Sequence, residues 1–220
     1  MKFNITQKRK LIFVKLAVIT FGFSLALVGF HNFNARFTKT LAASSGPTPG
    51  HAGAPGEANC TACHSDFSVN SGTGNISITG LPANYLPNRQ IPVTVTINQS
   101  NAVVFGFQLT AVDSQGRRIG TYTLPAQTPQ QLQIVNWQIG GRERSYVQHT
   151  NNGITPTQFD TKSWTFTFNT PPQRAGKITF YAAGNAANSD RDATGDYIYT
   201  TSKSTLSGSA SSNFDGDILS

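Results

Sequence analysis

Residues 91–97 have the sequence Ile-Pro-Val-Thr-Val-Thr-Ile, in which every position except Pro92 carries a β-branched side chain. From Val93 onward apolar and polar residues alternate. Successive side chains of a β-strand point to opposite faces, so this alternation places the apolar side chains together on one face. The stretch therefore predicts a strand with one buried face.

The same texture continues on both sides of residues 91–97, and Gly, Asn, Pro and Asp turn signals separate the segments. No segment with a helical period competes after the first 43 residues. About nine strands are predicted: Asn75–Thr79, Ile91–Ile97, Val103–Val112, Arg118–Leu124, Gln131–Ile139, Arg144–His149, Trp164–Phe168, Lys177–Ala183 and Asp196–Thr201. Short strands at regular spacing predict an all-β fold, an antiparallel β-sandwich, in one domain. Trp164, Phe166 and Phe168 share one face of their strand, and we expect them in the core.

The N-terminal 43 residues have the composition of a targeting segment. Lys8, Arg9 and Lys10 precede an apolar run from Leu11 to Phe30 that only Lys15 interrupts. This pattern predicts a signal peptide that is cleaved near Ser44, or a single membrane anchor if cleavage fails. We therefore expect an extracytoplasmic protein, in the periplasm or at the cell surface, with inner-membrane association if the segment is kept.

Three further parts follow the targeting segment. Residues 44–59 are rich in Gly, Pro, Ala and Ser and predict a linker or draped loop. Residues 60–202 form the predicted sandwich domain, and residues 203–220 form a Ser- and Gly-containing C-terminal tail.

The net charge of +7 is concentrated in the targeting segment. Seven of the 17 basic residues precede Ser44, where no acidic residue lies, which leaves ten basic residues against all ten acidic ones. A nearly neutral remainder gives no electrostatic footprint for nucleic acid, so we expect no nucleic-acid partner.

All cysteines of the chain lie in one motif, Cys60-Thr61-Ala62-Cys63-His64. Two thiols at this spacing can bond covalently to one haem, and the next histidine can bind its iron as the proximal ligand. The motif therefore predicts one covalent haem c held by Cys60, Cys63 and His64. The alternatives are a zinc site, a redox dithiol and a structural disulfide.

The motif sits within a longer pattern that resembles a known family. The matching stretches are Gly53–Glu57 before the cysteine motif, Val104–Leu109, Tyr146–Thr150, Trp164–Phe166, Pro171-Pro172, Gly184–Asn188 and Gly195–Tyr199. In this order they resemble the bacterial choice-of-anchor V domain, which is similar to the Reeler domain of reelin. The resemblance implies an exported, immunoglobulin-like (Reeler-like) sandwich with a haem-bearing loop segment. The long C-terminal region that usually carries the family's sorting signal has no counterpart here, so we do not expect retention by the C-terminus.

A second iron ligand is sought by elimination. The only methionine is Met1, His31 lies in or beside the targeting segment, and His51 lies in the predicted loop. His149 ends a predicted strand at a position that matches a histidine of the family, so we expect it as the distal ligand. His51 and an open sixth site are the alternatives.

One loop carries several oxygen ligands, and no other catalytic pattern is present. Asp190, Asp192 and Asp196, with Asn185 and Asn188 nearby, offer oxygen ligands for calcium, although the spacing fits no EF-hand and a solvated turn is the alternative. No nucleophile elbow or telling carboxylate pair occurs, so no catalytic residues are assigned.

These features predict an exported monohaem c-type cytochrome that transfers electrons to a redox partner protein that the sequence does not identify. The first alternative is a haem-based sensor or peroxidase with an open sixth site. The second alternative is a cell-surface adhesion or scaffold module, and whether the chain is an enzyme is left open.

Overall fold

The strand predicted at residues 91–97 forms β3 (Gln90–Asn98), which pairs antiparallel with β8 (Thr161–Asn169) in the computed structural model. Val95 lies opposite Trp164 and Val93 lies opposite Phe166, so the apolar faces of the two strands coincide. All four of these side chains are buried, which confirms the core position predicted for the aromatic residues of β8.

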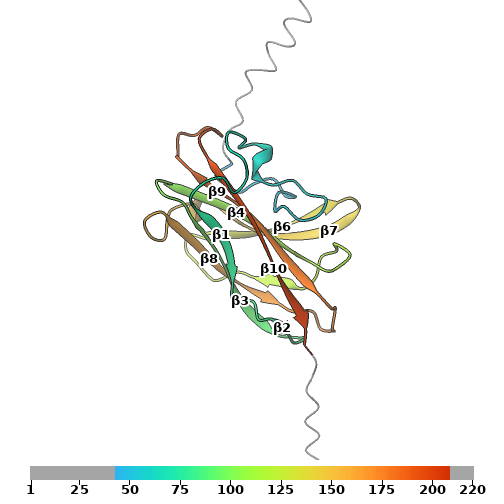
Figure 1. Ribbon diagram of the computed structural model, residues 1–220. Coiled ribbons are helices and arrows are strands. Elements are labelled where there is room, and N and C mark those ends of the chain that lie inside the picture. The colour runs from blue at the N-terminus through green and yellow to red at the C-terminus, as the bar shows by residue number, and fades with distance from the viewer. Residues whose placement is uncertain (1–42, 209–220) are drawn as a thin grey trace, which may run out of the picture. The chain divides into compact units, whose positions relative to one another are not determined.

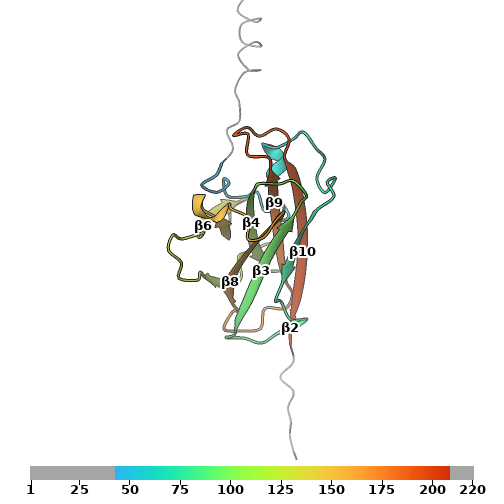
Figure 2. The same ribbon diagram turned by 90° about the vertical axis from the view of Figure 1, so that its left-hand side faces the viewer.

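The structure describes residues 43–208. Two β-sheets face each other, as Figures 1 and 2 show from two directions. One sheet has the order β1-β3-β8-β5, with β1 at Asn75–Thr79 and β5 at Thr121–Thr123. The other has the order β2-β10-β9-β4-β7-β6, with bounds Asn84–Tyr85 (β2), Tyr197–Ser207 (β10), Ile178–Ala187 (β9), Val104–Val112 (β4), Arg142–His149 (β7) and Leu132–Ile139 (β6). Two single 3-10 turns, η1 (Cys60–Ala62) and η2 (Asn151–Gly153), complete the described elements.

The observed strands differ from the prediction in several places, and β7 (Arg142–His149), β8 (Thr161–Asn169) and β9 (Ile178–Ala187) are longer than predicted. The strand predicted at 118–124 is shortened to β5, because Gly120 adopts a φ of +65° against the ring of Phe168 and breaks the extended run. β2 is a two-residue strand that the sequence pattern did not indicate, and it pairs parallel to β10. β10 continues to Ser207, beyond the predicted end at Thr201.

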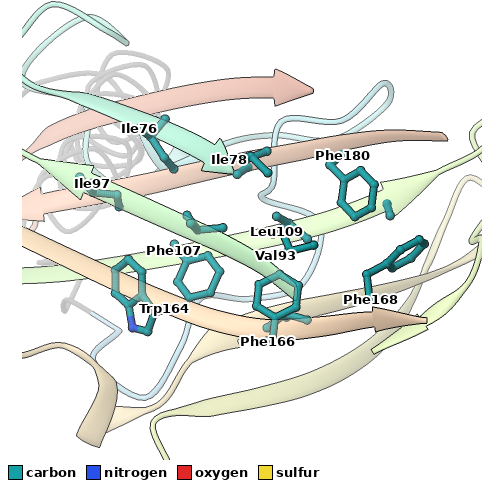
Figure 3. Packing of buried hydrophobic residues seen from close by; sticks show 14 of the residues in the cluster. Ile76, Ile78, Val93, Ile97, Phe107, Leu109, Trp164, Phe166, Phe168 and Phe180 are labelled. Atoms are coloured by element: carbon teal, nitrogen blue, oxygen red, sulfur yellow. The ribbon is translucent and has the colours of Figure 1, made fainter. Parts of the chain in front are cut away.

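The space between the two sheets is filled by apolar side chains from both (Figure 3). Phe107 of β4 packs on Trp164 of β8 with ring centroids 4.4 Å apart, and Phe168 meets Phe180 of β9 edge to face at 4.8 Å. Trp164 donates its indole N–H to the Gly153 carbonyl at 2.7 Å, so the polar atom of this buried ring has a partner. The interior is a packed core, and the candidate site lies outside it.

The predicted targeting segment, residues 1–43, and the end of the predicted tail fall outside the described residues, apart from Ala43 and residues 203–208. Within residues 43–208 no helix is both long and apolar enough to cross a membrane.

Candidate functional site

Residues 43–66, here called the roof segment, lie across the outer face of the six-stranded sheet, the face turned away from the core. The amide of His51 donates to Gln108 Oε1 of β4 at 2.7 Å, and Arg144 of β7 donates to the Pro55 carbonyl at 3.0 Å. Gln133 of β6 donates to the Ser45 carbonyl at 2.6 Å. The part predicted as a linker or draped loop is thus draped over β4, β7 and β6, as Figure 1 shows.

A buried ion pair attaches the middle of the roof segment to β7. Arg144 Nη1 lies 2.5 Å from Glu57 Oε1, and the Tyr146 hydroxyl donates to the same oxygen at 2.7 Å. The side chains of Arg144 and Glu57 are 2% and 0% exposed. Burial, and next the hydrogen bond to Glu57, raises the pKa of Tyr146. We call Glu57, Arg144 and Tyr146 the latch.

The cysteine motif forms the turn η1 at one end of the roof segment. Asn59 caps the turn, because its Oδ1 accepts hydrogen bonds from Thr61 N at 2.8 Å and Thr61 Oγ1 at 2.7 Å. Cys60 and Cys63 are both free thiols, the first partly buried and the second exposed. Burial raises the pKa of Cys60 to about 12, so this thiol stays protonated at neutral pH.

His64 is oriented by a carboxylate from the far end of the chain. Its Nδ1 lies 2.7 Å from Asp196 Oδ2, and the Asp196 side chain is 1% exposed. Asp196 Oδ2 also accepts from Asn185 Nδ2 at 3.2 Å. A carboxylate at Nδ1 holds the proton on that nitrogen, so Nε2 is the acceptor atom of the neutral ring.

His149 occupies a place in the sheet that a backbone group would normally fill. The Phe107 amide donates to His149 Nδ1 at 3.0 Å, and regular pairing of β4 with β7 is confined to Gln108–Thr110. His149 Nδ1 also lies 3.2 Å from the Phe107 carbonyl, so both polar groups of the Phe107 backbone face this ring nitrogen. Burial lowers the pKa of His149 below its ordinary value, although hydrogen bonds to the backbone of Phe107 and Ala43 oppose the shift.

A cavity of about 160 Å³ lies between the roof segment, the first residues of β4 and the last residues of β9. The predicted site residues Cys60, Cys63, His64 and His149 all line it, and so does His51. Val104, Gly106, Asn185 and Ala187 form its floor. The fold thus brings the residues predicted from the sequence together at one place.

The acidic loop before β10 does not form one cluster of free carboxylates. Asp196 turns toward His64, whereas Asp190 accepts hydrogen bonds from the Asp192 amide at 2.8 Å and from Asn188 Nδ2 at 3.2 Å. These short local bonds are typical of Asx turns. Calcium binding by this loop stays a prediction.

Two features of the site were missed from the sequence. Asp196 was considered only as a calcium ligand, yet it lies against His64 across 132 residues of chain. The latch joins residues 87 positions apart. No local spacing connects such pairs, and only the fold brings them together.

Neither a protein-family profile nor a curated protein sequence matches the chain. The solved structures with a similar fold include the human F-spondin Reeler domain (fragment 1), with 16% identity, a TM-score of 0.41, and coverage of 65% of this chain and 96% of that one. The Reelin-N domain of F-spondin has 15% identity, a TM-score of 0.42, and coverage of 68% and 97%. A cohesin module from a Clostridium perfringens ATCC13124 family 33 glycoside hydrolase has 8% identity, a TM-score of 0.44, and coverage of 63% and 98%. At these identities the likeness concerns the Reeler-like sandwich fold alone.

The prediction of a monohaem electron-transfer cytochrome is wrong. Within residues 43–208 no group of three or more His, Cys, Asp or Glu side chains could hold a metal ion. Covalent attachment of a group at Cys60 and Cys63 stays a prediction.

Proposed function

We propose that the chain is an extracytoplasmic scaffold module that joins to a second copy of itself through the free edge of β6. β6 is the end strand of the six-stranded sheet and is eight residues long. The other edge strands, β1, β5 and β2, have five, three and two residues. Among residues 43–208 no further strand pairs with this edge of β6, and the length of the edge is the observation that carries the proposal.

The composition of β6 favours pairing. Its sequence, Leu-Gln-Ile-Val-Asn-Trp-Gln-Ile, contains no charged residue, proline or glycine. Proteins usually protect long edge strands with such residues, because an open row of amides and carbonyls otherwise recruits another strand. Ile134 and Trp137 are also 40% and 52% exposed, so apolar surface lies on both faces beside the edge.

The turn after β6 determines which backbone groups face the edge. Gly140 and Gly141 form a two-residue turn with φ of +55° and +76°, so the flanking pair Ile139 and Arg142 is hydrogen-bonded. Bonded and non-bonded pairs alternate from there along the hairpin. The amides and carbonyls of Ile134, Asn136 and Gln138 therefore point away from β7 toward the free edge.

A second copy is the occupant that this strand fits. A two-fold axis at Asn136 gives antiparallel pairing with about six backbone hydrogen bonds. Trp137 then lies opposite Val135 of the second copy on the outer face, an aromatic and β-branched pair of the kind that stabilises sheets. No like charges face each other, because β6 carries none.

The test is the oligomeric state of a chain that begins at residue 43, measured by analytical ultracentrifugation over a concentration series up to about 100 µM. We expect a reversible dimer. Trp137→Lys should give a monomer, because two lysines would then flank the two-fold axis at the edge. Phe159→Lys is the matched control, since Phe159 is 89% exposed on a loop and should leave the dimer intact.

A wild-type chain that is monomeric throughout this range would overturn the proposal. A dimer that Trp137→Lys leaves unchanged would also overturn it, because the contact would then lie on another surface. Hydrogen exchange shows whether the contact lies at β6: if it does, the Asn136 and Gln138 amides should be protected in the dimer and not in the monomer.

A further inference from the structure

We infer that the cavity under the roof segment is a binding site for one small aromatic ring that carries a hydrogen-bond donor, as in a phenol. The site shares no residue with β6 and is independent of the proposed self-association. Three observations define the ligand: the volume of the cavity, the character of its walls, and a buried acceptor atom.

The volume selects a single ring. The cavity measures about 160 Å³, and an apolar cavity of about 150 Å³ in another protein holds benzene. The cavity has this volume partly because Gly106 has no side chain. A Cβ atom there would lie 2.6 Å from His149 Cε1, so even alanine at this position would press on a wall of the cavity.

The walls are mostly apolar or flat. Val104 and Ala187 contribute apolar side chains, and the imidazoles of His51 and His149 add planar surfaces. One ring nitrogen of each imidazole is engaged elsewhere: His51 Nδ1 lies 2.9 Å from the Thr48 carbonyl, and the Phe107 amide donates to His149 Nδ1. An apolar ring body suits such walls better than a charged ligand.

One polar atom in the cavity lining lacks a partner. Asn185 Oδ1 accepts no hydrogen bond from any residue between 43 and 208, and it has almost no accessible surface, so a ligand donor reaches it after a small shift of the cavity lining. The orientation of this amide is fixed, because its Nδ2 donates to Asp196 Oδ2 at 3.2 Å. A buried acceptor that receives no hydrogen bond raises the free energy of the protein. A ligand whose hydroxyl or N–H donates to Oδ1 should therefore bind more tightly than a ligand that has no donor.

Isothermal titration calorimetry with phenol, toluene and cyclohexanol tests each part of this inference. Phenol should bind, toluene should bind about fivefold more weakly because it lacks the donor, and cyclohexanol should bind more weakly because it is not planar. N-acetyltyrosinamide reports whether the mouth admits a ring attached to a polypeptide. Its binding would indicate a partner's tyrosine as the ligand, and its failure beside bound phenol would indicate a free small molecule.

Ala187→Leu fills the cavity and should reduce phenol affinity at least tenfold. Val104→Leu on the adjoining strand is a second filling variant, in case the first does not fold. Thr179→Leu is the control, because Thr179 lies on the same outer face of β9 but does not line the cavity. Absence of phenol binding at millimolar concentration, or equal affinity in wild type and both filling variants, would overturn the inference. Equal binding of phenol and toluene would overturn the role of Asn185.

Discussion

The latch offers the sharpest test of how the roof segment is held. Glu57→Gln keeps the size of the side chain but removes its charge, which leaves the Arg144 guanidinium buried without a counter-ion. Removing one partner of a buried ion pair costs about 3–5 kcal/mol. Arg144 retains two carbonyl acceptors, Pro55 at 3.0 Å and Gly116 at 3.1 Å, so we expect the lower end of that range, about 3 kcal/mol.

Because the latch attaches a surface segment, its loss should appear first as local opening. Three backbone bonds within the segment report this opening: Gly53 N to Ala58 O, Glu57 N to Ala54 O, and Ala58 N to Gly50 O. A loss of about 3 kcal/mol raises the exchange rate of these amides about 100-fold. Hydrogen exchange measured by NMR at fixed pH and temperature gives this ratio directly.

The chain contains a matched exposed pair, Arg118 and Glu143, whose side chains are 39% and 48% exposed at a distance of 2.9 Å. Glu143→Gln should change stability by less than about 1 kcal/mol and leave the roof amides unaffected. The double variant Glu57→Gln with Arg144→Met should lose less stability than the sum of the losses in the two single variants, because it leaves no buried charge. Exchange rates that rise less than about threefold in Glu57→Gln, or equally in Glu143→Gln, would refute the reasoning.

Three further predictions concern the cavity lining. Burial holds the pKa of His149 below its ordinary 6.5, so the unfolded chain binds more protons below that pH and stability falls as pH drops from 6.5 toward the folded pKa. His149→Gln should make stability depend less on pH in this range, as urea midpoints at several pH values will show. An unchanged pH dependence would contradict this prediction. Because burial raises the pKa of Cys60 to about 12, iodoacetamide at pH 8 should label the exposed Cys63 well before Cys60, and equal rates by mass spectrometry would contradict this. Gly106→Ala should cost about 1–3 kcal/mol in thermal unfolding, because its Cβ displaces the His149 ring from the Phe107 amide; a loss within error would mean that the ring moves freely.

The parts of the fold that could be predicted depend on local periodicity. The alternation in residues 91–97 and 164–168 places Val93, Val95 and Phe166 in the core, because the side chains of a strand alternate whatever its partner is. Strand order and the parallel pairing of β2 with β10 depend on contacts between distant segments. The break at Gly120 also needed its contact with Phe168, which no turn rule supplies.

In the candidate site, too, the sequence predicts the local features and only the fold determines the contacts between distant residues. The cysteine motif is a local pattern, and elimination among four histidines pointed to His149, so both were placed at what is one cavity. What the cavity holds stays a prediction, because residue spacing indicates which atoms are reactive and carries no information on volume. The roof segment decides that volume, and its position depends on Glu57 and Arg144, whose 87-residue separation no motif records.

The latch and the cavity are therefore coupled through the roof segment. His51 and Cys60 line the cavity and lie on either side of Glu57 along the chain, so opening the latch moves two walls of the cavity together. Because linkage is reciprocal, a ring bound in the cavity must stabilise the closed roof by as much as the closed roof favours the ring. Phenol should then slow exchange of the Ala58 amide in the wild type, and Glu57→Gln should weaken phenol binding although Glu57 does not line the cavity. Binding without any change in the exchange of Ala58 would show that the roof is rigid and that the latch serves the fold alone.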